Sequence, residues 1–224
     1  MATKTVLITG ANRGIGLELA RKHQAAGWRV IGTARDVAKA TELEAVAEVL
    51  PLDVTDPGSI DALAAALEGR AIDRLINNAG VFGPRDGQGG GFDELDYAAW
   101  LDTLNANCLG PVRTAMALGD RLTESGQVYT ITSQMGSIAL TSGNSPIYRS
   151  SKTAVNMAMA CLAQHWPKRT VALFHPGWVQ TDMGGASADL TVEQSAAGLI
   201  AVMERLKLAD SGGFFNHDGA SIPW

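Results

Sequence analysis

The segment from Val6 to Gly16 reads V-L-I-T-G-A-N-R-G-I-G, a short apolar run that leads into a glycine-rich turn. The run shows no polar alternation, which is typical of a strand buried on both faces of a parallel sheet. After the turn, apolar residues at Ile15, Leu19 and Ala20 follow a helical spacing. Glycines in such a turn let the backbone approach a pyrophosphate, and the helix N-terminus offers N–H groups to its charge. The pattern therefore favours a dinucleotide site over a plain strand–helix connection.

The same alternation of apolar runs and helical patterns continues along the chain. It predicts further strands near residues 30–31, 49–50, 75–76, 128–131, 171–174 and 214–215. Helices are expected over 37–46, 57–69, 93–124, 146–165 and 191–206, with the third of these interrupted at Gly110-Pro111. Strands that alternate with helices form right-handed βαβ units. The predicted fold class is therefore α/β, a single Rossmann-type doubly wound parallel sheet flanked by helices, in one domain over 1–224.

Composition and charge narrow the classes of function. The 224 residues are 46% hydrophobic and 18% charged, as in an ordinary globular protein of one domain. No apolar run approaches the roughly 18 residues of a membrane span. The N-terminus lacks the apolar region of a signal peptide. The net charge of -5, without a basic run, argues against nucleic acid and anionic membranes as main partners.

The cysteines and histidines indicate neither a disulfide framework nor a metal site. Cys108 and Cys161 form no CxxC pair, so a reduced, cytoplasmic protein is expected. The histidines show no HxxxH or HExxH spacing, so we expect no dedicated zinc site.

Polar motifs follow the glycine turn in a fixed order. They are Asn77-Asn78-Ala79-Gly80, Ser133-x-x-Gly136, Tyr148-x-x-x-Lys152 and Pro176-Gly177. A YxxxK pair alone means little, because one arises by chance in about 8% of chains of this composition, and a tyrosine on a helix surface would explain it. A ligand-binding site is indicated because each motif lies at or just beyond the carboxyl end of a predicted strand. Ligands bind at that edge in open α/β sheets.

With these motifs in this order, the sequence resembles the short-chain dehydrogenase/reductase family over essentially its whole length. Within the family it is most similar to the C-factor group of small oxidoreductases, relatives of the sniffer-type carbonyl reductases. The closer resemblance rests on residues 133–138, 148–152, 175–183 and 218–224. It implies an enzyme that transfers hydride between NADP(H) and a small carbonyl or alcohol substrate. The alternative is a C-factor-like signalling or cofactor-sensing protein; such sensors tend to lose the tyrosine or lysine, and both are present here.

The resemblance also implies a catalytic tetrad of Asn107, Ser133, Tyr148 and Lys152. Tyr148 is the expected general acid and base. Lys152, one helical turn away, is expected to lower the pKa of Tyr148 from its usual value near ~10, together with the nicotinium charge of the oxidised complex. Ser133 is expected to hydrogen-bond the substrate oxygen. Ser137 is a minor alternative to Ser133, because Ser133 is separated from Tyr148 by more residues than in many members of the family. Asn105 lies close to Asn107 in the sequence, but the family's Asn-x-x-Gly spacing selects Asn107.

Cofactor choice depends on the end of the second strand. Counting about 20 residues from Gly16 reaches Asp36, which as a ribose ligand would indicate NAD. The family register instead places the discriminating position at Ala34, with Arg35 beside it. A missing carboxylate and an added guanidinium suit a 2′-phosphate, with Arg13 as a second cation, so NADP is favoured over NAD. Asp36 is then expected to be the N-cap of the following helix.

The other cofactor contacts are implied by the matching positions of the family. Asp53 and Val54 are expected at the adenine, and the segment from Pro176 to Thr181 at the nicotinamide. The full predicted set is Gly10, Asn12, Arg13, Gly14, Ile15, Gly16, Arg35, Asp53, Val54, Asn78, Ala79, Gly80, Tyr148, Lys152, Pro176, Gly177, Val179 and Thr181.

Several other side chains have two interpretations. Phe82 and Phe92 flank a glycine-rich loop and either pack down or face a ligand. Four further residues either line the substrate pocket or only pack, namely Gln134, Met135, Trp178 and Met183. Small and sulfur-bearing residues crowd positions 154–161. By analogy with the family, they predict a homo-oligomer, a dimer or tetramer, that uses this helix and the long helix before it.

Overall fold

A seven-stranded parallel sheet runs through the protein in the order β3-β2-β1-β4-β5-β6-β7. The computed structural model describes residues 3–224. The strands are β1 (Thr5–Ile8), β2 (Arg29–Ala34), β3 (Glu48–Pro51), β4 (Ile72–Asn77), β5 (Leu122–Ile131), β6 (Thr170–His175) and β7 (Phe214–Asn216). The α-helices are α1 (Gly14–Ala25), α2 (Thr41–Glu44), α3 (Pro57–Ala66), α4 (Tyr97–Leu104), α5 (Gly110–Ala117), α6 (Pro146–His165) and α7 (Val192–Arg205). The predicted doubly wound α/β fold is confirmed.

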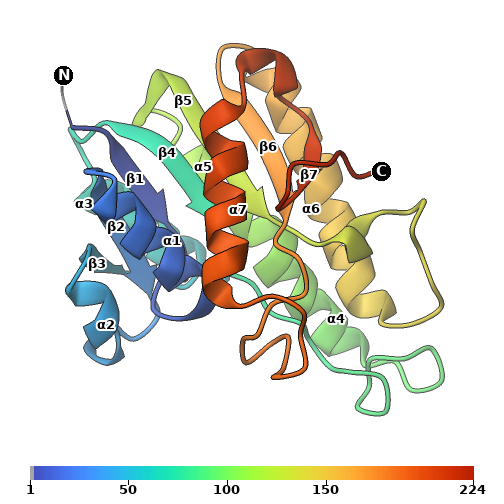
Figure 1. Cartoon of the computed structure of the whole chain (residues 1–224). Coiled ribbons are helices and arrows are strands. Elements are labelled where there is room, and N and C mark those ends of the chain that lie inside the picture. The colour runs from blue at the N-terminus through green and yellow to red at the C-terminus, as the bar shows by residue number, and fades with distance from the viewer. Residues whose placement is uncertain (1–2) are drawn as a thin grey trace.

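Helices cover both faces of this sheet (Figure 1). α1 and α7 pack on one face, where Leu19 and Leu199 meet Phe174 of β6 in a buried cluster. α3, α5 and α6 cover the other face with side chains such as Leu63 and Val155. Among residues 3–224, no helix is both long and apolar enough to cross a membrane.

The strand order reverses at β1, which pairs with β2 on one side and β4 on the other. The strand arrows of Figure 1 point to one edge of the sheet, where the glycine turn and the segments after β4, β5 and β6 gather. A crevice at such a reversal is where open α/β sheets bind ligands. The fold therefore brings all the motifs predicted from sequence to one edge.

Two predicted helices differ from the structure. The pattern over 93–124 is divided into α4, a π-helical turn at Asn105–Leu109, and α5, and the chain from Leu122 onward belongs to β5. Leu122 pairs with Ile72 of β4, so strand pairing overrides the local helical spacing. The pattern over 37–46 forms only a 3-10 turn and the single turn α2. In contrast, α6 has the predicted bounds, and Thr191 forms the predicted capping box with Gln194 at α7.

A buried arginine joins the sheet to the helices α1 and α7. Arg74 of β4 is 1% exposed. Its Nε donates to Gln127 Oε1 at 2.8 Å, and its Nη1 lies 2.8 Å from Glu204 Oε1 and 2.9 Å from His23 Nε2. Buried charges in proteins need such partners, because an unpaired one loses its hydration without compensation.

The protonation state of His23 follows from this arrangement. Burial lowers the pKa of His23 to about 4, so the imidazole is neutral near pH 7. Its Nδ1–H donates to the Leu19 carbonyl at 2.7 Å, which leaves Nε2 as the acceptor for Arg74. The cluster is therefore satisfied in one tautomer of His23.

Candidate active site

A cavity of about 500 Å³ opens at the carboxyl edge of the sheet. It collects most of the residues that the sequence predicts to contact a cofactor. Those in its wall are Gly10, Asn12, Arg13, Gly14, Ile15, Arg35, Asp53, Val54, Asn78, Ala79, Gly80, Tyr148, Lys152, Pro176 and Thr181. The structure places Gly16, Gly177 and Val179 outside the wall.

The glycine turn is shaped for close approach of backbone groups. Gly10 and Gly14 have φ angles of 62° and 54°, which L residues rarely adopt. A Cβ at Gly16 would lie 2.5 Å from both the Gly10 carbonyl oxygen and Asn78 Nδ2. Arg13, the N-cap of α1, makes no side-chain hydrogen bond to the first helical turn. The N–H groups at the start of α1 are therefore suited to an anion in the cavity, and these residues fit a dinucleotide pyrophosphate.

Arg35 and Asp53 form the end of the cavity beyond β2 and β3. Asp53 Oδ1 accepts hydrogen bonds from the hydroxyl and N–H of Thr55, at 2.6 and 2.9 Å. These bonds, with a smaller effect of the Arg35 charge, hold the pKa of Asp53 below its usual range. Asp36 lies outside the cavity wall, at the N-cap position of the 3-10 turn, and its carboxylate pairs with Lys39 at 2.8 Å. Arg35, rather than Asp36, thus faces the cavity.

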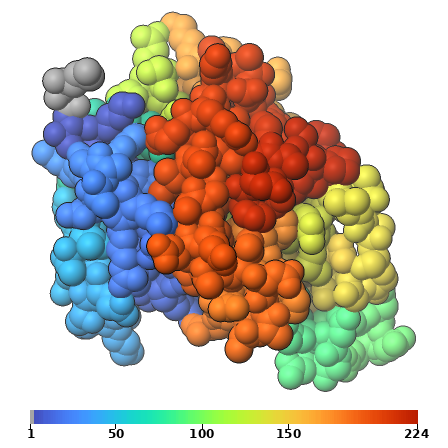
Figure 2. All heavy atoms as spheres, in the orientation of Figure 1, coloured from blue at the N-terminus to red at the C-terminus, as the bar shows by residue number. Residues whose placement is uncertain are grey.

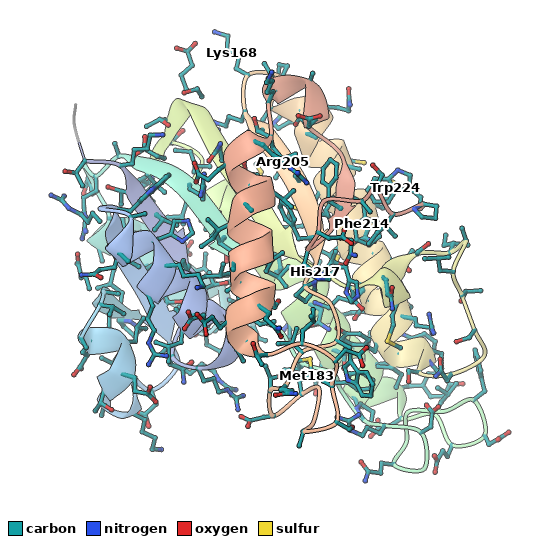
Figure 3. All side chains as sticks on the ribbon, viewed as in Figure 1. Lys168, Met183, Arg205, Phe214, His217 and Trp224 are labelled. Carbon is teal, nitrogen blue, oxygen red and sulfur yellow. The ribbon has the colours of Figure 1, made fainter. Side chains whose placement is uncertain are left out.

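Arg13 has a partner that the sequence did not predict. Its guanidinium forms an ion pair with Asp182, in the segment between β6 and α7, and both side chains are exposed. Figure 2 shows this orange segment at the lower edge, between blue and green parts of the chain. Met183, labelled in Figure 3, follows Asp182 at this edge. The second cation predicted for a 2′-phosphate is therefore already paired with a carboxylate.

Tyr148 lines the cavity, and Ser133 lies beside it, just outside the cavity wall. Tyr148 lies on the buried face of α6, and the Ser133 side chain interacts with its hydroxyl. Ser133 also accepts a hydrogen bond from Met135 N at 3.1 Å, which fixes it at the start of a 3-10 turn. The oxygen of Ser137 instead accepts from Leu140 N at 3.2 Å. The structure therefore brings Ser133, and not Ser137, to Tyr148.

Burial controls the ionisation of Tyr148 and Lys152. It raises the pKa of Tyr148 to about 12, while Ser133 lowers it by a smaller amount. Lys152 Nζ lies 5.6 Å from the Tyr148 ring centroid and donates to the Ile131 carbonyl at 3.3 Å. Burial lowers the pKa of Lys152 to about 8. Burial therefore dominates the pKa of Tyr148 in this structure, and its hydroxyl is protonated at neutral pH. The lowering expected from Lys152 together with the nicotinium charge stays a prediction.

The π-helical turn places Asn107 beneath the cavity. Within this turn the N–H of Gly110 bonds to the carbonyl of Asn105, five residues back. Asn107 is 1% exposed. Its Oδ1 accepts from Val81 N at 2.8 Å, and its Nδ2 donates to Val81 O at 2.7 Å and to Ser151 Oγ at 3.0 Å. Asn107 thus holds the segment after β4 against α6.

Gly80 allows Asn107 and Lys152 to approach the same backbone. A Cβ at Gly80 would lie 2.9 Å from Asn107 Oδ1 and 3.5 Å from Lys152 Nζ. The alternative residue Asn105 faces elsewhere, since it donates to Thr55 O and accepts from Arg113. The structure therefore groups Asn107, and not Asn105, with the predicted tetrad.

Sequence reasoning missed part of the cavity wall. The additional wall residues include Leu52, Thr55, Val81, Ala106, Ile131, Thr132, Gln180, Asp182 and Val192. Met183, which the sequence left open, also lines the cavity, whereas Trp178 and Gln134 do not. Phe82 stacks on Tyr148, while Phe92 is 68% exposed. The sequence feature that could have indicated the position of Phe82 near the site is its place two residues after the Asn-Asn-Ala-Gly motif.

This arrangement combines a cradle that fits a dinucleotide with a hydroxyl that is able to donate a proton. The cradle is made of backbone N–H groups and glycines, and Tyr148 supplies a protonated hydroxyl in the same cavity. Among residues 3–224, no group of three or more His, Cys, Asp or Glu side chains could hold a metal ion. The geometry suits donation of a proton to a carbonyl oxygen in the cavity.

Comparisons with known proteins agree with this geometry. Residues 4–190 match the family described as short chain dehydrogenase. The C-signal protein of Myxococcus xanthus is 42% identical over 158 residues, covering 68% of this chain and 93% of that protein. The NADPH-bound carbonyl reductase from chicken fatty liver has a TM-score of 0.90 at 31% identity, covering 100% of both chains. Carbonyl reductase Sniffer of D. melanogaster also has a TM-score of 0.90, at 30% identity over 100% of both chains.

Proposed function

The chain belongs to the short-chain dehydrogenase family, and from this premise we propose that it is an NADPH-dependent oxidoreductase that interconverts a small carbonyl compound and its alcohol. The observation that carries the proposal is that the cavity wall contains both Tyr148 and Lys152, with Ser133 beside the protonated Tyr148 hydroxyl. The similarity to the NADPH-bound carbonyl reductase supports the same activity.

The cofactor would be held along the cavity from the glycine turn to Pro176. NADPH, when bound, supplies the hydride. Backbone N–H groups at Gly14 and Ile15 would bind the pyrophosphate, because they lie at the start of α1. Arg35 would bind the 2′-phosphate, with Arg13 as a second cation once its pair with Asp182 opens.

Tyr148 and its neighbours would handle the proton. The Tyr148 hydroxyl donates its proton to the substrate oxygen as negative charge develops there, and Ser133 donates a hydrogen bond to the same oxygen. The Lys152 ammonium then stabilises the tyrosinate that remains. Asn107 touches none of the cavity space, so it acts by holding Val81 and the α6 residue Ser151 in place.

The activity is tested by mixing the protein with NADPH and a panel of aldehydes and ketones. Oxidation of NADPH is followed by its absorbance, and the matching alcohols are tested with NADP. We expect turnover of at least one apolar carbonyl compound. If the protein binds NADPH but reduces none of the compounds in the panel, the result would favour the signalling or sensing function described below.

We expect NADPH to bind at least tenfold tighter than NADH, a difference of about 1.4 kcal/mol, because Arg35 faces the cavity and Asp36 does not. Arg35→Ala should remove most of that preference. Fluorescence titration with both cofactors measures it. Lys39→Ala is a matched control, since this cation pairs with Asp36 outside the cavity. Equal or tighter binding of NADH by the wild-type protein would contradict the assignment of Arg35.

A signalling or cofactor-sensing role is the second candidate, favoured by the 42% identity to C-signal. A signalling role predicts that cofactor binding, without turnover, is sufficient for the effect of the protein in cells. Tyr148→Phe separates the two candidates, because that variant should still bind NADPH but lack catalysis. An effect in cells that survives this substitution would support the signalling role.

We also propose a cytoplasmic location. Cys108 is buried and Cys161 exposed, and both are free thiols. Proteins of oxidising compartments generally pair their cysteines. Fractionation of cells that express the full chain tests the location.

We further propose that the protein is a homo-oligomer built on α4, α5 and α6. These helices expose large apolar side chains, among them Leu101 at 69%, Met116 at 51% and Met157 at 67%. Burying such side chains against a second copy is favourable. Light scattering at micromolar concentration is expected to give at least twice the monomer mass, and Met157→Lys to weaken the assembly. A monomer mass for the wild-type protein would contradict the proposal.

A further inference from the structure

An aromatic side chain covers one face of the Tyr148 ring. The centroids of the Phe82 and Tyr148 rings are 4.4 Å apart, and the ring planes differ by 15°. Tyr148 belongs to α6, whereas Phe82 lies in the segment after β4 and is half-buried. Parallel rings at this separation attract one another beyond the effect of burial alone. The contact therefore joins the Tyr148 ring to a separate segment of the chain.

The backbone beside Phe82 is fixed from the sheet side. Val81, its neighbour, has both its N–H and its carbonyl bonded to the side-chain amide of Asn107, at 2.8 and 2.7 Å. Asn107 itself sits in the π-helical turn and is bonded to Ser151 of α6. The turn, Asn107 and Val81 thus form a continuous set of contacts that ends at the Phe82 ring.

The far side of Phe82 is also held. The Arg85 guanidinium lies 4.7 Å from the Phe82 ring centroid, and its Nη2 donates to the Met183 carbonyl at 2.9 Å. Asp86 Oδ1 accepts from Ser145 N at 3.1 Å, at the start of α6. Phe82 is therefore enclosed between Tyr148 on one side and Arg85 on the other.

We propose that Phe82 is a positioning residue for Tyr148: its ring holds the phenol ring in the orientation from which the hydroxyl meets Ser133 and the substrate oxygen. The inference rests on the proposed role of Tyr148 as proton donor. A positioning role for Phe82 differs from a simple packing role in one respect. An apolar filler can be replaced by leucine, whereas a stacking partner needs a second flat ring.

The contact also bears on the ionisation of Tyr148. The polar and charged groups around the Tyr148 ring are Lys152 on the same helix, Ser133 after β5, and Arg85 beyond the Phe82 ring. Removing the Phe82 ring would admit water to one face of Tyr148 and reduce its desolvation. The pKa of Tyr148 should then fall, because burial is the main cause of its rise.

The stack can be measured without turnover. NMR of protein with labelled tyrosine gives the ring resonances of Tyr148, assigned by their loss in Tyr148→Phe. A ring stacked on Phe82 should carry an upfield ring-current shift. We expect Phe82→Leu to abolish this shift, Phe82→Tyr to keep it, and Phe92→Leu to leave it unchanged, since Phe92 is an exposed aromatic of the same segment.

Kinetics then test positioning against packing. Phe82→Leu should lower kcat about three- to tenfold with little change in the KM for NADPH, and should move the pH profile of alcohol oxidation toward lower pH. Phe82→Tyr should restore both, and Phe92→Leu should behave as wild type. Wild-type kcat and pH profile in Phe82→Leu, or an unaltered Tyr148 resonance, would overturn the proposal. Loss of the resonance shift in a protein that reduces no carbonyl would support the stack and refute the proposed function instead.

Discussion

Replacing Tyr148 by phenylalanine is expected to lower turnover of carbonyl reduction by about 10²–10⁴-fold, while NADPH affinity changes no more than a few-fold. The substitution keeps the ring that stacks on Phe82 and removes only the hydroxyl that meets Ser133. The packing of α6 should therefore survive, and the loss should fall on proton transfer. Steady-state kinetics on a substrate whose chemistry limits the rate, with a fluorescence titration of NADPH, measure both quantities.

Tyr97→Phe provides the matched control. Tyr97 begins α4 and is 69% exposed, so its hydroxyl should be dispensable. A Tyr148→Phe protein that retains more than about a tenth of wild-type turnover would falsify the role of the hydroxyl, since general acid catalysis contributes more than that.

Lys152→Ala extends the same prediction to the pH profile. Without the ammonium, the tyrosinate loses a neighbouring positive charge, so the pKa of Tyr148 should rise. In the proposed reaction Tyr148 is the base for alcohol oxidation, so the rate increases with pH as Tyr148 loses its proton. In Lys152→Ala this increase should occur at higher pH than in the wild-type protein. The shift is opposite in sign to that expected for Phe82→Leu. Profiles that move in the same direction in the two variants would contradict the electrostatic account.

Arg74→Ala is expected to reduce the free energy of unfolding by about 3–5 kcal/mol. It leaves the buried acceptor His23 Nε2 and the partly buried acceptor Gln127 Oε1 without a donor, and it removes the guanidinium that lies 4.5 Å from the Trp28 ring centroid. Thermal denaturation should show the midpoint falling by roughly 10 °C. Circular dichroism of the full chain, with and without NADPH, is sufficient for the measurement.

Lys168→Ala is the control for the loss of a cation. Lys168 pairs with Glu124, and the two side chains are 74% and 77% exposed. Such surface pairs contribute about 0–1 kcal/mol, so the midpoint should hardly change. An Arg74→Ala protein as stable as Lys168→Ala would mean that the buried cluster is not a source of stability.

The sequence predicted the fold well where local and tertiary preferences agree. The helix α6 begins at Pro146 and the helix α7 begins after the capping residue Thr191, as their sequences indicate. Prediction was wrong at Leu122, where apolar spacing continued a helix but pairing with β4 makes a strand. Strand pairing joins residues far apart in the chain, and periodicity within one segment carries no information about it.

The site was predictable as a set of backbone positions and less so as a set of side-chain contacts. The glycine turn and Tyr148 lie in one cavity, as the motifs indicate. The ion pair of Arg13 with Asp182 and the stacking of Phe82 on Tyr148 were not predicted. Both join loops whose mutual distance depends on the whole fold. The effect of burial on the Tyr148 pKa was not predicted either, because no motif encodes how deeply a side chain is buried.

The π-helical turn at Asn105–Leu109 makes this short segment sensitive to deletion. A π turn accommodates one residue more than an α-helix would over the same rise. Removing a single residue there would change the rotation of α5 relative to α4, and Pro111 would still leave one carbonyl of the preceding turn without an N–H donor. Each helical residue turns the chain by about 100°, so Asn107 would rotate away from Val81. In this segment the number of residues is therefore constrained by the chemistry of the site, and a shorter chain could fold well and still be inactive.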